Sequence, residues 1–425
     1  MRFIFILFFT IFFSMPSFLH ALEQDEIARN RDLKRIIDVG DFYFREKDYK
    51  NAFNYYKKAM EINNSLPLIH YRLGNAYSYI NPGKDYSENE YAIALYLFLK
   101  EHPDLKNVDV ESIKKALEIP SDTPIRFMRR DIDKDKKDTI FLLMKRGFRS
   151  YVLFAIDIDE FHPKISHLVT YYKGDNGTDD IDFKDLDEDG KEEIIIVCNM
   201  KDFLNLVVIR KNNDKYETIL NHMGAFKGKF LISKSKATGL KDIEVFENLR
   251  EGVAFSENTG PFLIKKTLYV LEKGVYRELQ SDVLKDEGFY LNEFFKALMV
   301  EGNFQKAYDV IDPNLFLEDA VKDDKFSEFV EYMKNDKYNA LLAEKGANTF
   351  FGKVLVKENV MITADEGWED LSPNKDRMPR IKSFVKNYKV YLGPNVYQVI
   401  MRKSGIWKVT RLVRLDATNE AGWSE

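Results

Sequence analysis

The sequence predicts a multidomain α+β protein with helical hairpins at the N-terminus, a strand-rich middle and a C-terminal α+β domain. First, Val39-Gly40 recurs 34 residues later as Leu73-Gly74, and this period is typical of stacked helical hairpins. Second, beyond Pro124 the helical spacing gives way to short β-branched and aromatic runs. Third, helical spacing returns near Glu287 and strands follow it, which is the order of an α+β domain.

Length and composition set the domain organisation and exclude two classes of partner. With 425 residues, 45% hydrophobic and 31% charged, the chain can form several compact domains. We place a leader at 1–21, a helical domain at 22–120, a β-rich domain at 124–280 and an α+β domain at 287–420. The net charge is −5, and the 64 basic and 69 acidic residues are interleaved, so we expect neither nucleic acid nor an anionic lipid surface as a partner.

The N-terminus is typical of an export signal peptide. Arg2 supplies the positive end, Phe3–Phe13 is an apolar run, and Leu19–Ala21 offers a cleavage site, so the mature protein would begin at Leu22. A retained membrane anchor is the less favoured alternative, because Pro16 interrupts the run short of the ~20 apolar residues that a spanning helix needs.

The single cysteine, Cys198, lies far from this leader. No cysteine therefore follows the signal to carry a lipid, and no intramolecular disulfide can form. We expect a periplasmic or secreted/cell-surface protein with no transmembrane span in the mature chain.

Two apolar faces occur along residues 33–66, separated by the polar break Glu46–Asp48. The pattern predicts two antiparallel helices, in which small residues permit a close approach and Tyr56 fills the gap between them. The residues of the pattern are Ile36, Val39-Gly40, Tyr43, Ala52, Tyr56 and Ala59.

These residues resemble the tetratricopeptide (TPR) repeat, whose consensus places an aromatic or aliphatic residue, Leu-Gly, Tyr, Ala, an aromatic residue and Ala at these positions. The resemblance covers about residues 33–100, with a second copy that keeps Leu73-Gly74 and Tyr77 and reaches Ala92 and Tyr96 after an insertion around Asn81–Gly83. Because two repeats are few, we expect helices at about 23–30 and 109–118 to cap the array.

The resemblance implies a protein partner. Members commonly bind extended peptides or helices along the concave face made by their first helices. The corresponding partner-binding positions here are Ile37, Asp41, Phe44, Arg45, Tyr71, Asn75 and Tyr79. Ile37 and Asp41 replace the lysine and asparagine with which some members clamp a C-terminal carboxylate, so we do not expect a chaperone-tail receptor. The alternative is that these side chains pack on the cap or on the next domain.

Three degenerate β units of roughly fifty residues are predicted between 124 and 280. Two acidic loops, Asp131–Asp135 and Asp185–Gly190, lie 54 residues apart and each precedes a strand. The strand-like runs are Thr139–Leu143, Tyr151–Ile156, Glu193–Val197, Leu206–Ile209, Lys241–Phe246 and Thr267–Leu271.

The second acidic loop has the donors of a cation site. Carboxylates at alternate positions of a turn converge, Gly190 permits a left-handed backbone, and oxygen ligands suit Ca²⁺. The expected metal ligands are Asp185, Asp187, Asp189, the Lys191 carbonyl and Glu193. An EF-hand is excluded, because Ile196 stands at the twelfth position where a bidentate Glu belongs.

The segment resembles the Asp-rich loops of FG-GAP and VCBS-type propeller repeats, which implies a structural role for Ca²⁺. The alternative is a solvated Asp-Gly turn without metal. In the first loop Lys136 stands in place of the Gly and Thr139 in place of the Glu, so we expect no metal there.

The C-terminal third begins with apolar stripes at helical spacing, which include Phe294 and Leu298, then Ala307 and Val310. Strands are predicted at Val354–Val356, Val360–Thr363, Lys389–Leu392, Val396–Met401 and Trp407–Leu412. This order resembles the NTF2-like superfamily, which serves as enzyme, binding pocket or dimerisation module. Alternatively, residues 302–311 form a stray repeat hairpin.

No catalytic motif accompanies these domains. The chain lacks G-x-S-x-G, Walker, G-x-G-x-x-G and H-E-x-x-H sequences, and all six histidines lie at or before His222. We therefore assign no catalytic residue and predict an exported bacterial protein that acts as a non-catalytic protein-binding or scaffold module. The alternative is an enzyme or small-ligand-binding protein with its pocket in the C-terminal domain.

Overall fold

The computed structural model describes residues 26–82, 85–102, 107–147, 150–158, 163–172, 178–200, 202–235, 238–249, 263–317, 324–335, 338, 354–361, 368–370, 379–381, 385–392 and 395–415. The predicted leader and its cleavage site lie outside them. The chain divides into two compact units, Met1–Lys201 with Asn205–Met223 and Asp202–Leu204 with Gly224–Glu425. The helical, strand-rich and mixed regions follow one another as predicted.

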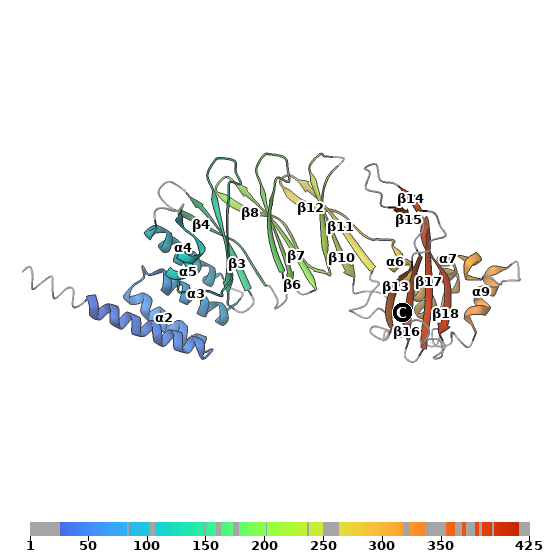
Figure 1. Cartoon of the computed structure of the whole chain (residues 1–425), viewed down its shortest axis with the longest axis horizontal. Coiled ribbons are helices and arrows are strands. Elements are labelled where there is room, and N and C mark those ends of the chain that lie inside the picture. The colour runs from blue at the N-terminus through green and yellow to red at the C-terminus, as the bar shows by residue number, and fades with distance from the viewer. Residues whose placement is uncertain are drawn as a thin grey trace, which may run out of the picture. The chain divides into compact units, whose positions relative to one another are not determined.

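The first unit begins with a helical array (Figure 1). A helix over residues 26–45 is followed by α2 (Tyr49–Ile62), α3 (Pro67–Ile80), α4 (Tyr86–Glu101) and α5 (Val110–Ala116). Of the cap expected at 23–30, residues 26–30 are described and are continuous with the first repeat helix, because no proline or glycine separates them and Leu33 and Ile37 are buried along one face. At α5 the second expected cap is present, and the Asp109 side chain accepts a hydrogen bond from the Ser112 amide (2.8 Å) to begin it.

Three four-stranded antiparallel sheets follow, and each is a meander of consecutive strands. The first sheet contains β1 (Ile125–Arg130), β2 (Thr139–Arg146), β3 (Ser150–Ile158) and β4 (Pro163–Tyr172). The second contains β5 (Thr178–Lys184), β6 (Glu193–Met200), β7 (Phe203–Asn212) and β8 (Lys215–Phe226). The third contains β9 (Lys229–Lys234), β10 (Lys241–Leu249), β11 (Leu263–Glu272) and β12 (Val275–Val283). These sheets confirm the three predicted β units, and the acidic loops join the first two strands of the first and second sheets.

The first sheet is buried on both faces. Because side chains alternate along a strand, Ile140 and Leu142 of β2 pack in one apolar cluster with α4 and α5. Their neighbours Phe141 and Leu143 pack in another cluster with β6 and β7 of the second sheet. This double burial explains why β2 is a continuous apolar run rather than an alternating one.

A buried ion pair fixes the array on the first sheet. Arg146 at the end of β2 places its Nε 3.0 Å from a Glu88 carboxylate oxygen on α4, and both side chains are about one-twentieth exposed. The same guanidinium donates to Ser87 Oγ (2.8 Å) and to the Pro82 carbonyl (2.8 Å), and Thr170 of β4 donates to Glu88 (2.9 Å). Because these partners satisfy the buried charges, the docking geometry of helix on sheet is specified.

The C-terminal region of the second unit is an α+β domain. Its helices are α6 (Glu287–Phe295), the π-helix η2 (Lys296–Glu301), α7 (Phe304–Val310), α8 (Pro313–Phe316) and α9 (Lys325–Met333). Strands β13 (Val354–Met361), β16 (Val385–Leu392), β17 (Asn395–Ser404) and β18 (Ile406–Leu415) form one antiparallel sheet, and β14 (Trp368–Asp370) pairs with β15 (Pro379–Ile381). The two strands expected within 354–363 are therefore one strand as far as Met361, and residues 362–363 lie outside the described part.

The core of this domain lies between its helices and its sheet. Phe294 and Phe329 from the helices are fully buried with Tyr388, Val399 and Val409 from the strands. None of the helices in the described part of the chain is long and apolar enough to cross a membrane.

Candidate functional site

The two repeats of the array have equivalent helix crossings. A methyl group on Gly40 would lie 2.5 Å from Cε1 of Tyr56, and one on Gly74 would lie 2.9 Å from Cε1 of Tyr91. Both tyrosines are buried, so each ring occupies the space that a larger side chain in the facing helix would need. The glycines predicted from the 34-residue period are thus confirmed at matching positions.

Two residues predicted to face a partner hold these tyrosines instead. The Tyr56 hydroxyl donates to Asp41 Oδ1 (2.6 Å), and the Tyr91 hydroxyl donates to Asn75 Oδ1 (2.8 Å). Asp41 also lies 3.0 Å from Nε of Arg72. Burial, with the hydrogen bond to Asp41, raises the pKa of Tyr56 far above its ordinary value, so the phenol remains a donor.

The other predicted partner-binding residues differ in accessibility. Ile37 and Tyr71 are buried in apolar clusters and contribute to the core of the array. Arg45 is exposed, and Phe44 and Tyr79 are half-buried. Burial of Ile37 and Tyr71, together with the hydrogen bonds that Asp41 and Asn75 make to the tyrosines, reduces the predicted set to Phe44, Arg45 and Tyr79.

Phe44 and Tyr79 belong to an aromatic triad that includes Tyr49. Tyr49 stacks on Tyr79 with ring centroids 4.1 Å apart, and Phe44 meets both rings edge-on at 5.3 and 5.6 Å. The rings come from the end of the first helix, the start of α2 and the end of α3. All three residues are half-buried, so each remains partly accessible to solvent. Tyr49 is not among the predicted residues, because it lies outside the first helices that the TPR resemblance assigns to binding.

A buried histidine links α3 to α4. Nδ1 of His70 lies 2.6 Å from a Glu90 carboxylate oxygen, and Nε2 lies 2.9 Å from the Asn64 carbonyl. A carboxylate and a carbonyl both accept, so these two contacts favour an imidazolium in which both ring nitrogens donate. Burial lowers the pKa of His70, but these hydrogen bonds outweigh it and the pKa is raised overall.

A comparison of the sequence with known protein families finds a match in the same region as the helical hairpins. A family model described as TPR repeat covers residues 40–78, from the first crossing glycine to the last turn of α3. Residues 40–78 match the TPR repeat. No curated protein and no solved structure matches the chain. The resemblances of the middle and C-terminal regions to other families stay predictions.

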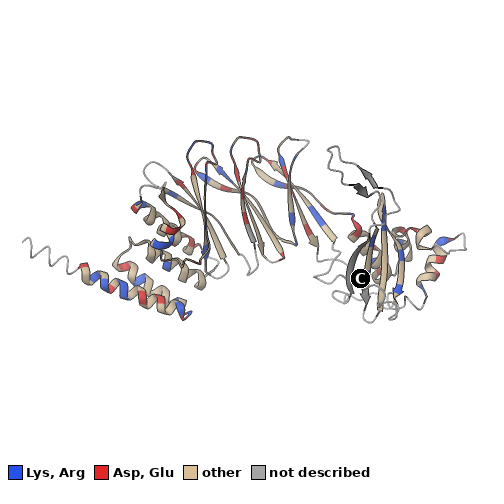
Figure 2. Cartoon of the chain, in the orientation of Figure 1, with Lys and Arg blue, Asp and Glu red and all other residues tan. Residues whose placement is uncertain are grey.

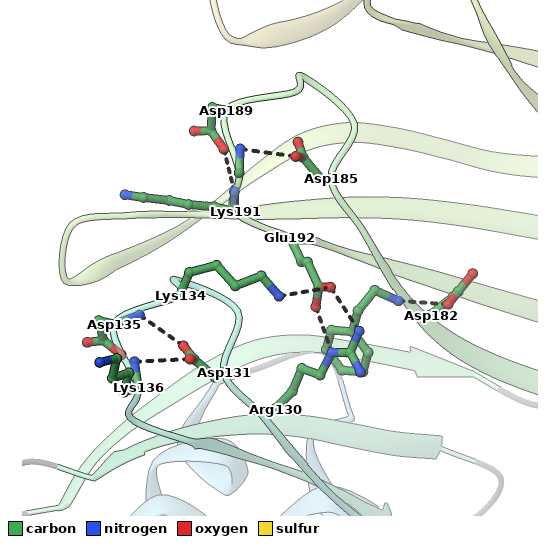
Figure 3. A network of polar contacts seen from close by, with 12 residues as sticks. Arg130, Asp131, Lys134, Asp135, Lys136, Asp182, Asp185, Asp189, Lys191 and Glu192 are labelled. Carbon is green, nitrogen blue, oxygen red and sulfur yellow. Dashed lines mark hydrogen bonds and ion pairs between the residues drawn. The ribbon is translucent and has the colours of Figure 1, made fainter.

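Beyond the TPR array, the two acidic loops have the same conformation. The Lys136 amide donates to Asp131 (3.0 Å) and the Gly190 amide donates to Asp185 (3.0 Å), 54 positions further on. Both donors have left-handed backbones, with φ of 70° at Lys136 and 90° at Gly190. Figure 3 shows the two turns near each other, each closed by its aspartate. The first loop therefore adopts the turn in spite of Lys136, and it does so at a cost in backbone strain.

Three of the predicted metal ligands converge. Oxygen atoms of Asp185, Asp187 and Glu193 all lie within 4.8 Å of one another. Asp189 instead accepts a hydrogen bond from the Lys191 amide (2.8 Å), as Figure 3 shows, so it caps the turn. We call Asp185, Asp187 and Glu193 the acidic triad.

A guanidinium contacts two members of the acidic triad. Nη2 of Arg210 lies 2.6 Å from Asp187 Oδ2, and its Nε donates to Glu193 Oε1 (3.0 Å). Burial raises the pKa of Asp187 and of Glu193, and Arg210 opposes both shifts. The sequence analysis missed Arg210, although the basic pair Arg210-Lys211 at the end of an apolar strand was a visible signal. Ca²⁺ at this loop stays a prediction.

The first acidic loop contacts the other residue of this pair. Nζ of Lys211 lies 2.7 Å from Asp133 Oδ2 and 2.8 Å from Asp157 Oδ1. The hydroxyls of Tyr216 (2.9 Å) and Thr139 (2.8 Å) also donate to Asp157. Lys211 and Tyr216 belong to the second sheet, whereas Asp133, Thr139 and Asp157 belong to the first sheet and its loop, so these contacts join the two sheets.

Glu192 adds a second junction between the loops. Its amide donates to the Ile132 carbonyl (2.9 Å). Its carboxylate accepts two hydrogen bonds from Arg130 (2.7 and 2.8 Å) and lies 3.4 Å from Lys134, as seen in Figure 3. The geometry of both loops therefore supports a structural role.

Proposed function

We propose that this protein acts as a non-catalytic protein-binding or scaffold module, and that its TPR array contacts another protein or peptide at the aromatic triad. TPR repeats generally mediate protein–protein interactions, which supports a protein partner. The observation that carries the proposal is the partial exposure of Phe44, Tyr49 and Tyr79, with Arg45 exposed beside them.

The triad has the properties of a binding anchor. Aromatic side chains offer a large contact area with few rotatable bonds, so fixing them on binding costs little entropy. Their mutual stacking holds the rings in place before a partner arrives, which reduces that cost further. Both signs of charge are interleaved on the array (Figure 2), so the partner is recognised by shape and apolar contact rather than by net charge.

The test is affinity capture from a bacterial envelope fraction with mass spectrometry, comparing the full chain with a Phe44→Ala/Tyr79→Ala variant. Aromatic anchors at interfaces contribute about 2 kcal/mol or more each, so retained partner should fall by about tenfold or more. The matched control is Phe42→Ala, which removes a neighbouring ring that is 52% exposed but lies outside the triad. Equal capture by the double variant and the wild type would count against the proposal, provided that both show the same helical circular dichroism.

We also propose that the chain is exported by residues 1–21 to the periplasm or cell surface of a bacterium. The charged end, apolar run and cleavage motif of the sequence support this. Intact mass of protein recovered from the envelope fraction should show an N-terminus at Leu22. An uncleaved chain confined to the cytosolic fraction would contradict it.

A further inference from the structure

We propose that Arg210 and Lys211 are the built-in cations of the two acidic loops, so that Arg210 holds the second loop without bound Ca²⁺ and Lys211 joins the first two sheets. This replaces the metal expected at the second loop with a guanidinium of the chain itself. The proposal does not depend on the function of the TPR array.

Two of the three carboxylates that a metal would need already have partners for both of their oxygen atoms. Asp187 accepts a hydrogen bond from the Asp189 amide on Oδ1 (3.2 Å) and pairs with Arg210 through Oδ2. Glu193 accepts one from the Leu186 amide on Oε2 (2.8 Å) and pairs with Arg210 through Oε1. A Ca²⁺ ion would have to displace the guanidinium to gain these two ligands, so the donor set does not fit a resident metal.

Because the carboxylates are buried, their mutual repulsion is strong and a positive charge among them is needed. The Glu193 side chain is 1% exposed, and those of Asp187 and Arg210 are 16% and 18% exposed. Carboxylates this close and this buried would repel one another strongly without a positive charge among them. Arg210 supplies that charge in a planar fork that contacts two carboxylates at once.

Strand alternation explains how one dipeptide serves both loops. Val207 and Ile209 of β7 face the first sheet, so Lys211 lies on the same side and reaches Asp133 and Asp157. Arg210 projects from the opposite face, where it meets Glu193 from the neighbouring strand β6.

The first and second sheets both pair largely buried carboxylates with a cation, but the cation comes from a different place in each case. Thr139 and Glu193 begin the equivalent strands β2 and β6, 54 residues apart. Across from Thr139 stands Asp157, an acid, so the first sheet holds no cation of its own at this place. Lys211 of the second sheet provides it and thereby ties the sheets together.

The first measurement is thermal unfolding of the full wild-type chain with EDTA and with about 10 mM CaCl₂. A site with a dissociation constant of about 1 mM, typical of extracellular modules, would raise Tm by roughly 3–6 °C. We expect a change below about 1 °C. A rise of several degrees in the wild type would overturn the proposal and support the Ca²⁺ prediction.

The second measurement is the same comparison on Arg210→Met, which keeps the length of the side chain and removes its charge. We expect Tm to fall by roughly 4–10 °C in EDTA, and Ca²⁺ to recover part of that loss, because the acidic triad is then without its cation. An Arg210→Met variant with unchanged Tm and no response to Ca²⁺ would overturn the proposal.

Two further variants keep the test decisive. The control variant Arg130→Met removes the cation of the neighbouring Arg130–Glu192 ion pair, in which the Arg130 side chain is 48% exposed. The Tm of this variant should not respond to Ca²⁺. Arg210→Lys retains the charge but not the planar fork, so it should fold even if Arg210→Met does not, with a Tm between those of Arg210→Met and the wild type. If Arg210→Lys is as destabilised as Arg210→Met, positive charge is not what the loop requires and the proposal is wrong.

Discussion

Gly40→Ala tests the packing on which the TPR array depends. On an exposed helix this change would stabilise by about 1 kcal/mol, because alanine has the higher helix propensity. Here the new methyl would lie 2.5 Å from Cε1 and 2.8 Å from Cδ1 of Tyr56, well inside the ~3.5–4.0 Å of a favourable carbon contact. The ring must therefore move by about 1 Å.

The ring of Tyr56 cannot move without further cost. It is fully buried, and its hydroxyl is held by Asp41 at 2.6 Å. Overpacking costs about 1–3 kcal/mol, and weakening a hydrogen bond to a carboxylate costs a further ~1.5–3 kcal/mol. After subtracting the gain in helix propensity, we expect a net loss of about 1.5–5 kcal/mol in the free energy of unfolding, or roughly 3–20 °C in Tm.

Urea unfolding of the full chain, followed by circular dichroism, measures this loss. Asn54→Ala, at an exposed position of α2, is the control and should change stability by less than about 0.5 kcal/mol. In a Tyr56→Leu background the penalty of Gly40→Ala should shrink by about 1 kcal/mol or more, because the obstructing ring is gone. If Gly40→Ala is as stable as the wild type, or its penalty is the same in both backgrounds, the inferred crossing is wrong.

Two other predictions follow from individual residues. The contacts that raise the pKa of His70 stabilise the fold fully below about pH 6.5 and lose that effect as pH rises through the folded-state pKa, so the Tm advantage of wild type over His70→Gln should shrink as pH rises above about 6.5. A Tm difference that stays constant as pH rises would contradict the buried imidazolium paired with Glu90. Lys136→Gly should stabilise the fold by up to about 1 kcal/mol, because glycine adopts the left-handed backbone at this position (φ 70°) without strain. Gly190→Ala should destabilise the fold by a similar amount because of its left-handed backbone, although nothing lies within 4 Å of the added methyl. Chemical denaturation measures both, and opposite signs in the two loops are the expected result.

Periodic features of this chain could be predicted well. The 34-residue spacing identified both crossing glycines, and the apolar runs identified the two central strands of each of the first two sheets and β10 and β11 of the third, whereas the more polar strands β1, β4, β5 and β9 were not predicted. The helix predicted at 109–118 is present as α5, and Asp109 is its N-cap residue, with a capping box to Ser112. These features depend on neighbours in the sequence, so local physics determines them.

Site residues were predicted less well, because their partners are distant in the sequence. Asp41 and Asn75 occupy positions that face a partner in the TPR consensus, yet here they accept hydrogen bonds from tyrosines 15 and 16 residues away. Tyr49 joins a triad with Tyr79, 30 positions later, through a contact that no local pattern encodes.

By itself the sequence determined which segments are helices and which are strands, where two repeats cross, and where carboxylates gather at a turn, since periodicity, glycine and turn chemistry act over a few residues. Only the tertiary structure decided which of those groups remain accessible. Arg210 meets Glu193 from 17 positions away and Lys211 meets Asp157 from 54 positions away. The strength of these charge interactions depends on the distance between the groups in space and on the exclusion of water, and neither can be predicted from the sequence of neighbouring residues.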